Sequence, residues 1–130
     1  MKFNFIRDGF LNQLSKSRTS DKEEKYPKIS IVMPSYNQVK YIERSILSVL
    51  NQNYPNFELI IIDGGSNDGT VDIIKKYNDK IHFWSSEKDK GQSDALNKGF
   101  KNCSGEFYGW LNSDDIYLPD TFEILGHLFK

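Results

Sequence analysis

The sequence has very little cysteine and no long apolar run. Cys103 is its single cysteine, which excludes an internal disulfide and a cysteine-based metal cluster. The longest unbroken apolar stretch is a few residues, well short of the roughly 20 that a membrane span requires. No apolar segment with a small-residue cleavage site follows Lys2 and Arg7, so we expect no secretory signal. These absences predict a cytoplasmic protein.

An excess of charge of either sign is also lacking. Seventeen Lys and Arg residues stand against 18 Asp and Glu residues, and the basic residues are scattered along the chain. There is therefore no electrostatic case for a nucleic-acid partner or an anionic membrane surface. With 38% apolar and 27% charged residues, the composition is that of a soluble globular protein. Its 130 residues are enough for one domain but few for an enzyme that holds two substrates.

The first 26 residues differ from the rest. A weakly amphipathic stretch is followed by the polar run from Ser15 to Lys25, which cannot bury much surface. We expect residues 1–26 to form a partly disordered N-terminal extension and residues 27–130 to form the domain. A surface arm is favoured over an amphipathic helix that touches a membrane, because the polar face of such a helix would not be strongly basic.

From Pro27 onward, short apolar runs alternate with segments of helical periodicity. The runs predict four strands, at 28–33, 57–62, 81–84 and 106–111. Apolar residues at helical spacing predict a helix after each strand, the first ending before Pro55 and the last running from Thr121 to Phe129. Four strand–helix units in succession imply an α/β fold, with a mainly parallel sheet and helices on both of its faces.

The turns that follow the four strands are the candidates for a binding site, because ligands of open α/β sheets bind beyond the carboxyl ends of the strands. All four carry acidic or amide side chains: 34–37, 63–70, 87–94 and 112–115. The phosphate-binding patterns G-x-x-x-x-G-K-[ST] and G-x-G-x-x-G do not occur. A phosphate ligand would therefore meet carboxylates, which repel it unless Mg²⁺ or Mn²⁺ lies between them.

Most of these residues also have an ordinary structural interpretation. Asp114 and its neighbours could cap a helix or form a turn. Asp63 could accept a hydrogen bond from a base imide or a ribose hydroxyl, or bond its own loop. Tyr36 could stack on a planar base or pack half-buried. For Asp68 the capping role is preferred, and His82, placed inside a strand, is interpreted as structural.

Taken together, these turns resemble the nucleotide-binding half of family 2 glycosyltransferases, the inverting enzymes of the GT-A fold. Residues 31–37 are similar to the family's first strand and base-binding turn, and 61–70 to its V-D-D-G-S-x-D-G-T motif. Residues 91–99 are similar to its A-x-N-x-G helix segment, and 105–115 to the strand that leads to the D-x-D metal motif. The resemblance covers residues 27–130 and implies a Rossmann-like three-layer sandwich, truncated after the fourth strand–helix unit.

The resemblance also implies roles for individual residues. Ser35 and Tyr36 would contact the base, and Asp63 would read its imide edge. Asp94 would line the diphosphate-sugar pocket, and Asp114 would ligate Mg²⁺ or Mn²⁺ that bridges the diphosphate, a Lewis-acid role. Asn112 and Asp115 are weaker candidates for the metal. The full implied nucleotide-sugar set is Pro34, Ser35, Tyr36, Asn37, Asp63, Gly65, Gln92, Asp94, Asn112, Ser113 and Asp114.

The chain departs from the family pattern in three places. Asn112 stands where the first Asp of D-x-D is common, and Gly64 where a second Asp is common. The resulting N-S-D-D motif resembles bacterial enzymes that build O-antigen and capsular polysaccharide. The family's catalytic base, a carboxylate in the second half of the domain, has no counterpart before Lys130. We expect it beyond that residue and assign it neither to Glu106 nor to Asp115.

The resemblance therefore implies a transferase that moves a sugar from a nucleoside-diphosphate sugar, with a UDP-sugar favoured, and inverts its configuration. The expected acceptor is a saccharide or a lipid-linked saccharide, in the cytoplasm or at the inner face of the membrane, with peripheral membrane association left open. Two alternatives remain. One is a catalytically inactive nucleotide-binding module of the same fold, and the other is an α/β regulator outside carbohydrate chemistry with an acidic cation site.

Overall fold

The computed structural model describes residues 4–5 and 26–129. Its centre is a five-stranded sheet with the strand order β1-β5-β2-β3-β4. The four longer strands are parallel, and the short β1 (Asn4–Phe5) pairs antiparallel with β5 at the edge of the sheet. The parallel strands are β2 (Ile29–Ser35), β3 (Phe57–Asp63), β4 (Phe83–Ser86) and β5 (Phe107–Trp110).

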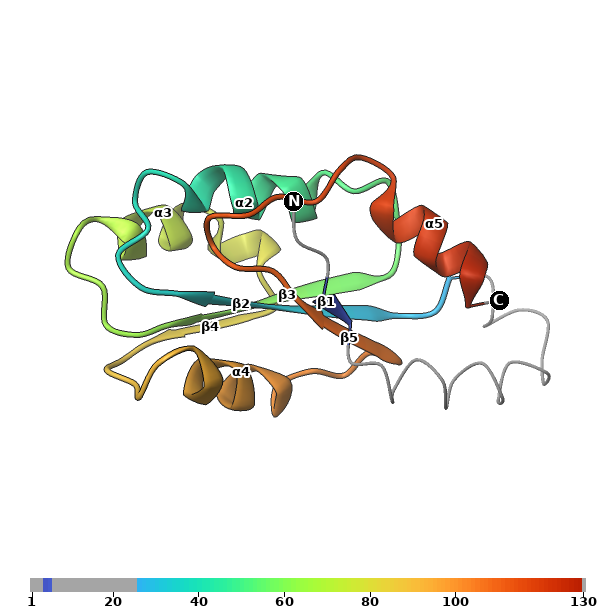
Figure 1. The fold of residues 1–130 in the computed structure, drawn as a ribbon. Helices are drawn as coiled ribbons and strands as arrows, with labels where there is room; N and C mark the ends of the chain where they lie inside the picture. Colours follow the sequence, from blue (N-terminus) through green and yellow to red (C-terminus); the bar gives the residue numbers. More distant parts are fainter. Residues whose placement is uncertain (1–3, 6–25, 130) are drawn as a thin grey trace.

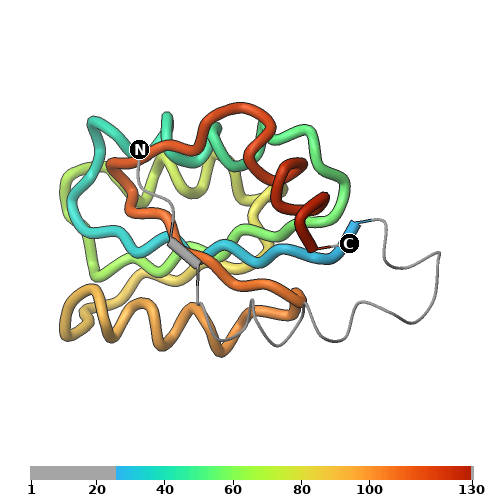
Figure 2. Tube along the Cα trace, turned by 45° about the vertical axis from the view of Figure 1, so that its right-hand side comes forward, coloured from blue at the N-terminus to red at the C-terminus, as the bar shows by residue number. Residues whose placement is uncertain are grey.

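Helices cover both faces of the sheet, as predicted. α2, α3 and α5 lie on one face and α4 lies on the other (Figure 1), and the same three layers are visible in Figure 2. Within the described residues, no helix is long and apolar enough to cross a membrane. The helices are α2 (Ile42–Leu50), α3 (Thr70–Lys76), α4 (Gln92–Phe100) and α5 (Thr121–Leu128), with the 3₁₀ turn η1 (Asn78–Lys80) before β4.

The two central strands are buried on both faces, which explains their nearly unbroken apolar sequences. Alternate residues point to opposite sides: Ile31 and Ile61 lie in the larger core beneath α2, α3 and α5. Val32 and Ile60 lie in a smaller core beneath α4, together with Ala95. The sheet therefore separates two apolar cores. At the carboxyl ends of the two central strands, polar residues follow the apolar ones: Ser35 ends β2 and Asp63 ends β3.

β2 extends two residues beyond the predicted end at Met33, through Pro34 to Ser35. Val32 accepts a hydrogen bond from Leu111 on the β5 side, and Ser35 accepts one from Gly64 on the β3 side. Pro34 therefore faces the β5 side, where strand pairing has already ended at Val32. The missing N–H of proline removes no ladder bond there, so the strand continues.

The prediction that β4 begins at Ile81 is wrong, and His82 does not lie inside a strand. The N–H groups of Lys80 and Ile81 both donate to the carbonyl of Tyr77, so Ile81 still belongs to the turn around η1. The strand begins at Phe83 and ends at Ser86, beside Asp63. Local hydrogen bonds of the turn thus shift the strand by two residues relative to its apolar pattern.

The N-terminal predictions fall almost entirely outside the described residues. This holds for most of the amphipathic stretch and for the polar run at 15–25. Asn4 and Phe5 form β1, a strand that the sequence analysis did not predict, opposite Trp110 and Gly109 of β5.

Gly99 allows α4 to pack directly on β2. A β-carbon at this position would lie 2.3 Å from Cγ1 of Val32. We expect Gly99→Ala to lower the free energy of unfolding by about 2 kcal/mol, because the core must shift to admit it. Urea denaturation of Gly99→Ala, Val32→Ala and the double variant measures the coupling. Strictly additive losses would show that this close contact is not the cause.

Candidate functional site

A cavity of about 580 Å³ opens beyond the carboxyl ends of β2 and β5. β2 lies between β3 and β5, so the strand order changes direction here, which is where open α/β sheets bind their ligands. Four segments supply the walls: the end of β2, the loop after β3, the loop before α4 and the loop after β5. The lining residues are Pro34, Ser35, Tyr36, Gln38, Gly64, Lys88, Asp89, Gly91, Gln92, Ala95, Asn112, Ser113 and Asp114.

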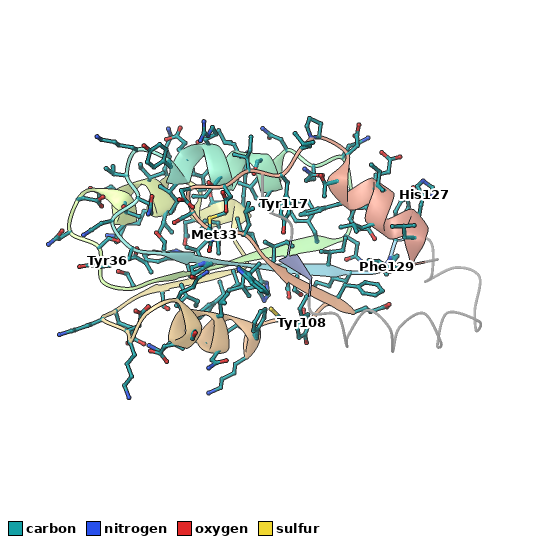
Figure 3. The ribbon with its side chains drawn as sticks, in the orientation of Figure 1. Met33, Tyr36, Tyr108, Tyr117, His127 and Phe129 are labelled. Carbon is teal, nitrogen blue, oxygen red and sulfur yellow. The ribbon has the colours of Figure 1, made fainter. Side chains whose placement is uncertain are left out.

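Ser35 and Tyr36 contribute a polar and an aromatic group to the cavity at the end of β2. Ser35 is only 6% exposed, and within the described part of the chain its Oγ has no hydrogen-bond partner. Such a group is destabilising by about 1–3 kcal/mol unless a ligand or water satisfies it. Tyr36 is 60% exposed and lies at the other end of the molecule from His127 and Phe129 (Figure 3). The ring of Tyr36 is therefore open to a ligand, whereas the hydroxyl of Ser35 is buried at the cavity wall without a partner among the described residues.

Asp63, in contrast, does not line the cavity. Its side chain is fully buried and accepts hydrogen bonds from the N–H of Gly65 at 3.1 Å and the N–H of Ser66 at 2.8 Å. The hydroxyls of Ser66 and Ser86 donate to it at 2.5 and 2.7 Å. The carboxylate thus organises its own loop and ties it to β4, which is the structural alternative that the sequence left open.

Asn37 and Asp68 hold the first two loops together behind the cavity. Asn37 has φ of 50°, donates its N–H to Ser66 Oγ at 2.7 Å and accepts from Asn67 N–H at 3.0 Å. Asp68 accepts from the N–H of Thr70 at 3.0 Å and the N–H of Val39 at 3.1 Å. Asp68 therefore fixes the turn into α3, as preferred from the sequence, although Gly69 occupies the cap position itself.

Two glycines of the loop after β3 make room for the loop before α4. Gly65 has φ of 86°, and a β-carbon there would lie 3.3 Å from the backbone nitrogen of Lys88. At Gly64, a β-carbon would lie 3.0 Å from both carboxylate oxygens of Asp89. Any side chain at position 64 would thus crowd the carboxylate of Asp89. Gly64 and Asp89 both line the cavity.

Asp94 is turned toward its own helix. It accepts from the N–H of Lys90 at 3.0 Å and pairs with Lys98 at 3.4 Å, one turn further along α4. The Lys90 hydrogen bond, with that ion pair, lowers the pKa of Asp94 below its ordinary value. Asp94 is not among the lining residues, whereas Gln92 at the start of the same helix is.

The loop after β5 leaves one carboxylate unengaged. Asn112 accepts from Gln92 Nε2 at 2.7 Å and donates to Asp115 Oδ2 at 3.4 Å, so both ends of its amide are used. Asp114 is exposed, lines the cavity and bonds to no other described residue. In the part of the chain that the structure describes, no three His, Cys, Asp or Glu side chains could hold a metal ion together. A divalent cation at Asp114 fits only if ligand oxygens complete its coordination, as Mg²⁺ commonly requires.

Helix α2 fixes the position of this loop. The hydroxyl of Ser45 donates to the carbonyl of Asp115 at 2.5 Å, and Ser48 accepts from the N–H of Tyr117 at 3.1 Å. Both serines lie on the same side of α2, three residues apart. The two bonds attach the loop after β5 to a helix that is packed on the core, so Asp114 is presented from a fixed backbone.

Half of the lining residues that the sequence did not indicate come from the loop before α4. Lys88 and Asp89 were within a turn singled out as a candidate, but nothing in the pattern showed which of its side chains face the ligand. That choice follows from the path of the loop, which includes Gly91 at φ of 112°. Nothing in the sequence indicated Ala95 or Gln38 as site residues, because a methyl group and a neutral amide suggest no particular chemistry.

The model of glycosyl transferase family 2 matches residues 30–130. The chain belongs to this family. An uncharacterized glycosyltransferase of Rickettsia typhi is 42% identical over 97 residues, covering 75% of this chain and 30% of that protein. The Escherichia coli UDP-Glc:alpha-D-GlcNAc-diphosphoundecaprenol beta-1,3-glucosyltransferase WfgD is 40% identical, covering 74% and 38%. The chain thus spans well under half the length of these relatives.

Solved structures of glycosyltransferases share the fold. Staphylococcus aureus TarS 1–349 in complex with UDP-GlcNAc has a TM-score of 0.71 and 30% identity, covering 77% of this chain and 30% of that one. A Pyrobaculum calidifontis mannosyltransferase in complex with GDP-Man and Mn²⁺ has a TM-score of 0.69 and 19% identity, covering 92% and 39%. The second likeness shows the fold alone. The predicted family and GT-A fold are confirmed.

Proposed function

We propose that this chain is the donor-binding part of a glycosyltransferase that uses a nucleoside-diphosphate sugar, with a UDP-sugar favoured, and transfers the sugar with inversion. The cavity at the carboxyl ends of β2 and β5 carries the proposal. It brings together the exposed ring of Tyr36, the unpartnered hydroxyl of Ser35 and the unengaged carboxylate of Asp114. Membership of the family and the UDP-sugar named for WfgD and TarS support the choice of donor.

Each of these residues has a distinct role in the proposal. The ring of Tyr36 stacks on the base, and the hydroxyl of Ser35 bonds a polar atom of the nucleoside, which satisfies a group that is otherwise buried without a partner. Asp114 would hold Mg²⁺ or Mn²⁺, with oxygens of the diphosphate as the further ligands. When bound, the cation offsets the charge that develops on the departing nucleoside diphosphate.

The acceptor that we propose is a saccharide or a lipid-linked saccharide in polysaccharide synthesis, such as O-antigen. WfgD is named for a lipid-linked saccharide acceptor, alpha-D-GlcNAc-diphosphoundecaprenol. With an acceptor of that class, we propose that the reaction occurs in the cytoplasm or at the inner face of the membrane, with the protein associated peripherally.

Thermal unfolding of the chain with UDP, GDP or dTDP, each with and without Mn²⁺, tests donor binding. At a concentration of about 100 times its Kd, UDP with Mn²⁺ should raise the free energy of unfolding by about 2.7 kcal/mol. This corresponds to an increase in Tm of about 10 °C. Asp114→Asn should lose the Mn²⁺-dependent part of this shift. Asp79→Asn is the matched control, because Asp79 is an exposed carboxylate in η1, before β4 and away from the cavity. The proposal fails if no nucleotide shifts Tm, with or without the metal.

Sugar transfer separates the enzyme from an inactive nucleotide-binding module. Radiolabelled UDP-sugars are incubated with the chain and with a longer protein that contains it, in the presence of polysaccharide and lipid-linked acceptors. Binding of UDP by the chain together with transfer by the longer protein supports the proposal. Binding without transfer by either would favour the inactive module.

A further inference from the structure

The cavity contains little positive charge for a ligand that would carry two phosphates. Three of its lining residues have charged side chains, and two of them, Asp89 and Asp114, are acids. The third is Lys88. A diphosphate that enters the cavity therefore meets more negative than positive side-chain charge. The ammonium of Lys88 is the one positive side-chain charge among the described lining residues, so its attraction for the phosphates matters most.

The backbone of Lys88 is held firmly at the wall of the cavity. The N–H of Glu87 donates to the carbonyl of Asp63 at 3.0 Å, which continues the bonding of β4 to β3 by one residue. Lys88 then passes against Gly65, where a β-carbon would lie 3.3 Å from its nitrogen. On its other side, the carboxylate of Asp89 accepts from the N–H of Gly91 at 2.9 Å. The position of the Lys88 α-carbon is therefore fixed relative to the cavity.

The acids around Lys88 are occupied by other groups. Lys98 pairs with both Glu87 at 3.5 Å and Asp94 at 3.4 Å. Across the described residues, Lys88 Nζ has neither a carboxylate within 4.0 Å nor a hydrogen-bond acceptor. By contrast, Lys28, Lys76 and Lys98 all have carboxylate partners. Lys88 thus has an exposed, unpaired ammonium on a fixed backbone in the wall of the cavity.

We propose that Lys88 binds the diphosphate of the donor and so makes the site select nucleoside diphosphates over nucleosides. The inference rests on the proposed function. An ammonium has three donors and a full positive charge, so it binds the charged oxygens of a phosphate more strongly than the neutral acceptors of a base or a ribose. Lys88 approaches the diphosphate from the loop before α4, whereas Asp114 acts through a cation from the loop after β5.

Titrations of the chain with UDP and with uridine, followed by NMR in Mg²⁺ and again in EDTA, test this role. Lys88→Met should weaken UDP binding at least tenfold, which corresponds to about 1.4 kcal/mol, since hydrogen bonds to charged groups contribute this much or more. Its affinity for uridine should stay within about twofold of the original. The loss should persist in EDTA, because the lysine acts directly on the phosphate.

Two further variants make the result specific. Lys88→Arg keeps the charge and should retain most of the affinity for UDP. Lys90→Met removes an exposed lysine that is two residues away and does not line the cavity, and it should bind UDP like the unchanged chain. Unaltered amide spectra of the ligand-free variants confirm that each is folded.

The outcomes distinguish the two proposals. The inference is wrong, and the proposed function stands, if the unchanged chain binds UDP and Lys88→Met lowers the affinity for UDP less than twofold. The same holds if Lys88→Met lowers the affinity for uridine as much as the affinity for UDP. An equal loss in Lys90→Met would overturn it as well, because general surface charge would then explain the effect. If the unchanged chain binds neither ligand, the proposed function fails and the inference fails with it.

Discussion

Replacement of Phe122 by alanine is expected to lower the free energy of unfolding by about 4 kcal/mol, the largest loss that we predict for a single side chain. Phe122 is fully buried at the inner face of α5. Its ring makes edge contacts with Tyr54, Phe57 and Tyr117, at centroid distances of 6.4, 5.4 and 5.4 Å. Because these rings come from different parts of the chain, truncation leaves a cavity that no single neighbour can fill.

The backbone around Phe122 is anchored to Gln52, which follows α2. Its N–H donates to Gln52 Oε1 at 3.0 Å, and Gln52 Nε2 donates to the carbonyl of Leu118 at 2.8 Å. These bonds hold the segment between the loop after β5 and α5. Loss of the aromatic contacts should therefore weaken the support of the loop that carries Asp114, as well as the core.

Urea denaturation monitored by circular dichroism measures this loss. Ile124→Ala is the matched control, since Ile124 lies in the same helix but is 60% exposed. Its change should stay within about 0.5 kcal/mol. Comparable losses in the two variants would show that helix propensity, rather than the buried ring, determines the effect.

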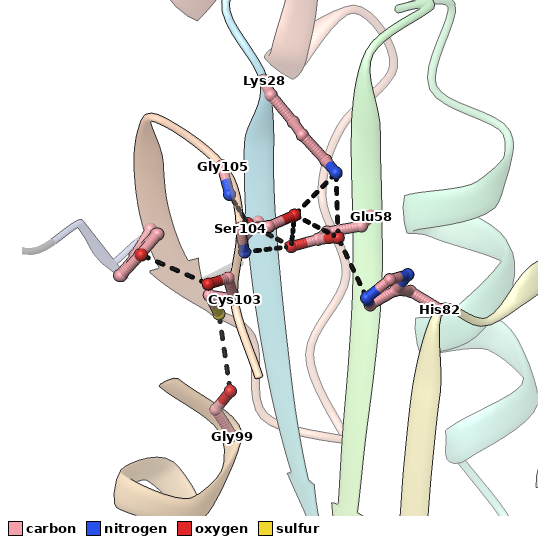
Figure 4. Close-up of polar contacts among 9 residues, drawn as sticks. Lys28, Glu58, His82, Gly99, Cys103, Ser104 and Gly105 are labelled. Atoms are coloured by element: carbon pink, nitrogen blue, oxygen red, sulfur yellow. Dashed lines mark hydrogen bonds and ion pairs between the residues drawn. The ribbon is translucent and has the colours of Figure 1, made fainter. Parts of the chain in front are cut away.

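Replacement of Glu58 has the second-largest expected effect, a loss of about 3 kcal/mol at neutral pH. Glu58 lies at the amino end of the sheet, at the centre of a polar cluster (Figure 4). The hydroxyl of Ser30 donates to it at 2.7 Å and the N–H of Ser104 at 2.6 Å. Lys28 and His82 contact its other oxygen at 3.1 and 3.4 Å. The carboxylate thus ties β3 to β2 and to the segments before β4 and β5.

The pKa of Glu58 shows that these contacts stabilise the charged form. Burial would raise the pKa, but the hydrogen bonds from Ser104, Ser30 and Lys28 outweigh it and hold the pKa at about 2, against 4.5 normally. A depressed pKa contributes stability that is complete above 4.5 and is lost as the pH falls toward 2. The lowered pKa corresponds to about 3 kcal/mol of the free energy of unfolding. More than half of this stabilisation should be lost at about pH 3.

Unfolding of Glu58→Gln and of the unchanged chain at a series of pH values tests this explanation. The difference between them should shrink as the pH falls below 4.5, because both side chains are then neutral in the unfolded state. Glu43→Gln is the control: Glu43 pairs with Lys76 on the surface, where an ion pair contributes little. A difference that stays constant down to pH 2 would contradict a role for the charge.

The resemblance of the four turns to family 2 motifs singled out several residues that the fold brings together at one cavity. Ser35, Tyr36 and Asp114 line the cavity as expected. Asn37, Asp63, Gly65 and Asp94, which belong to the same predicted set, do not line it. A sequence motif shows where along the chain a polar residue occurs, but not whether its own loop has already taken its hydrogen bonds. Asp63 has four such bonds within the protein, and only the folded loop reveals them.

The single cysteine excluded an internal disulfide by itself, and the balanced charge gave no electrostatic case for a nucleic-acid partner. The alternation of strand and helix patterns then determined the α/β fold, because periodicity is a local property that the sequence carries directly. Only the tertiary structure decided which side chains share the cavity. Lys88 and Asp89 enter it because Gly64 and Gly65 let two loops approach within van der Waals contact. Such a contact depends on atoms more than twenty residues apart, and no local pattern encodes it.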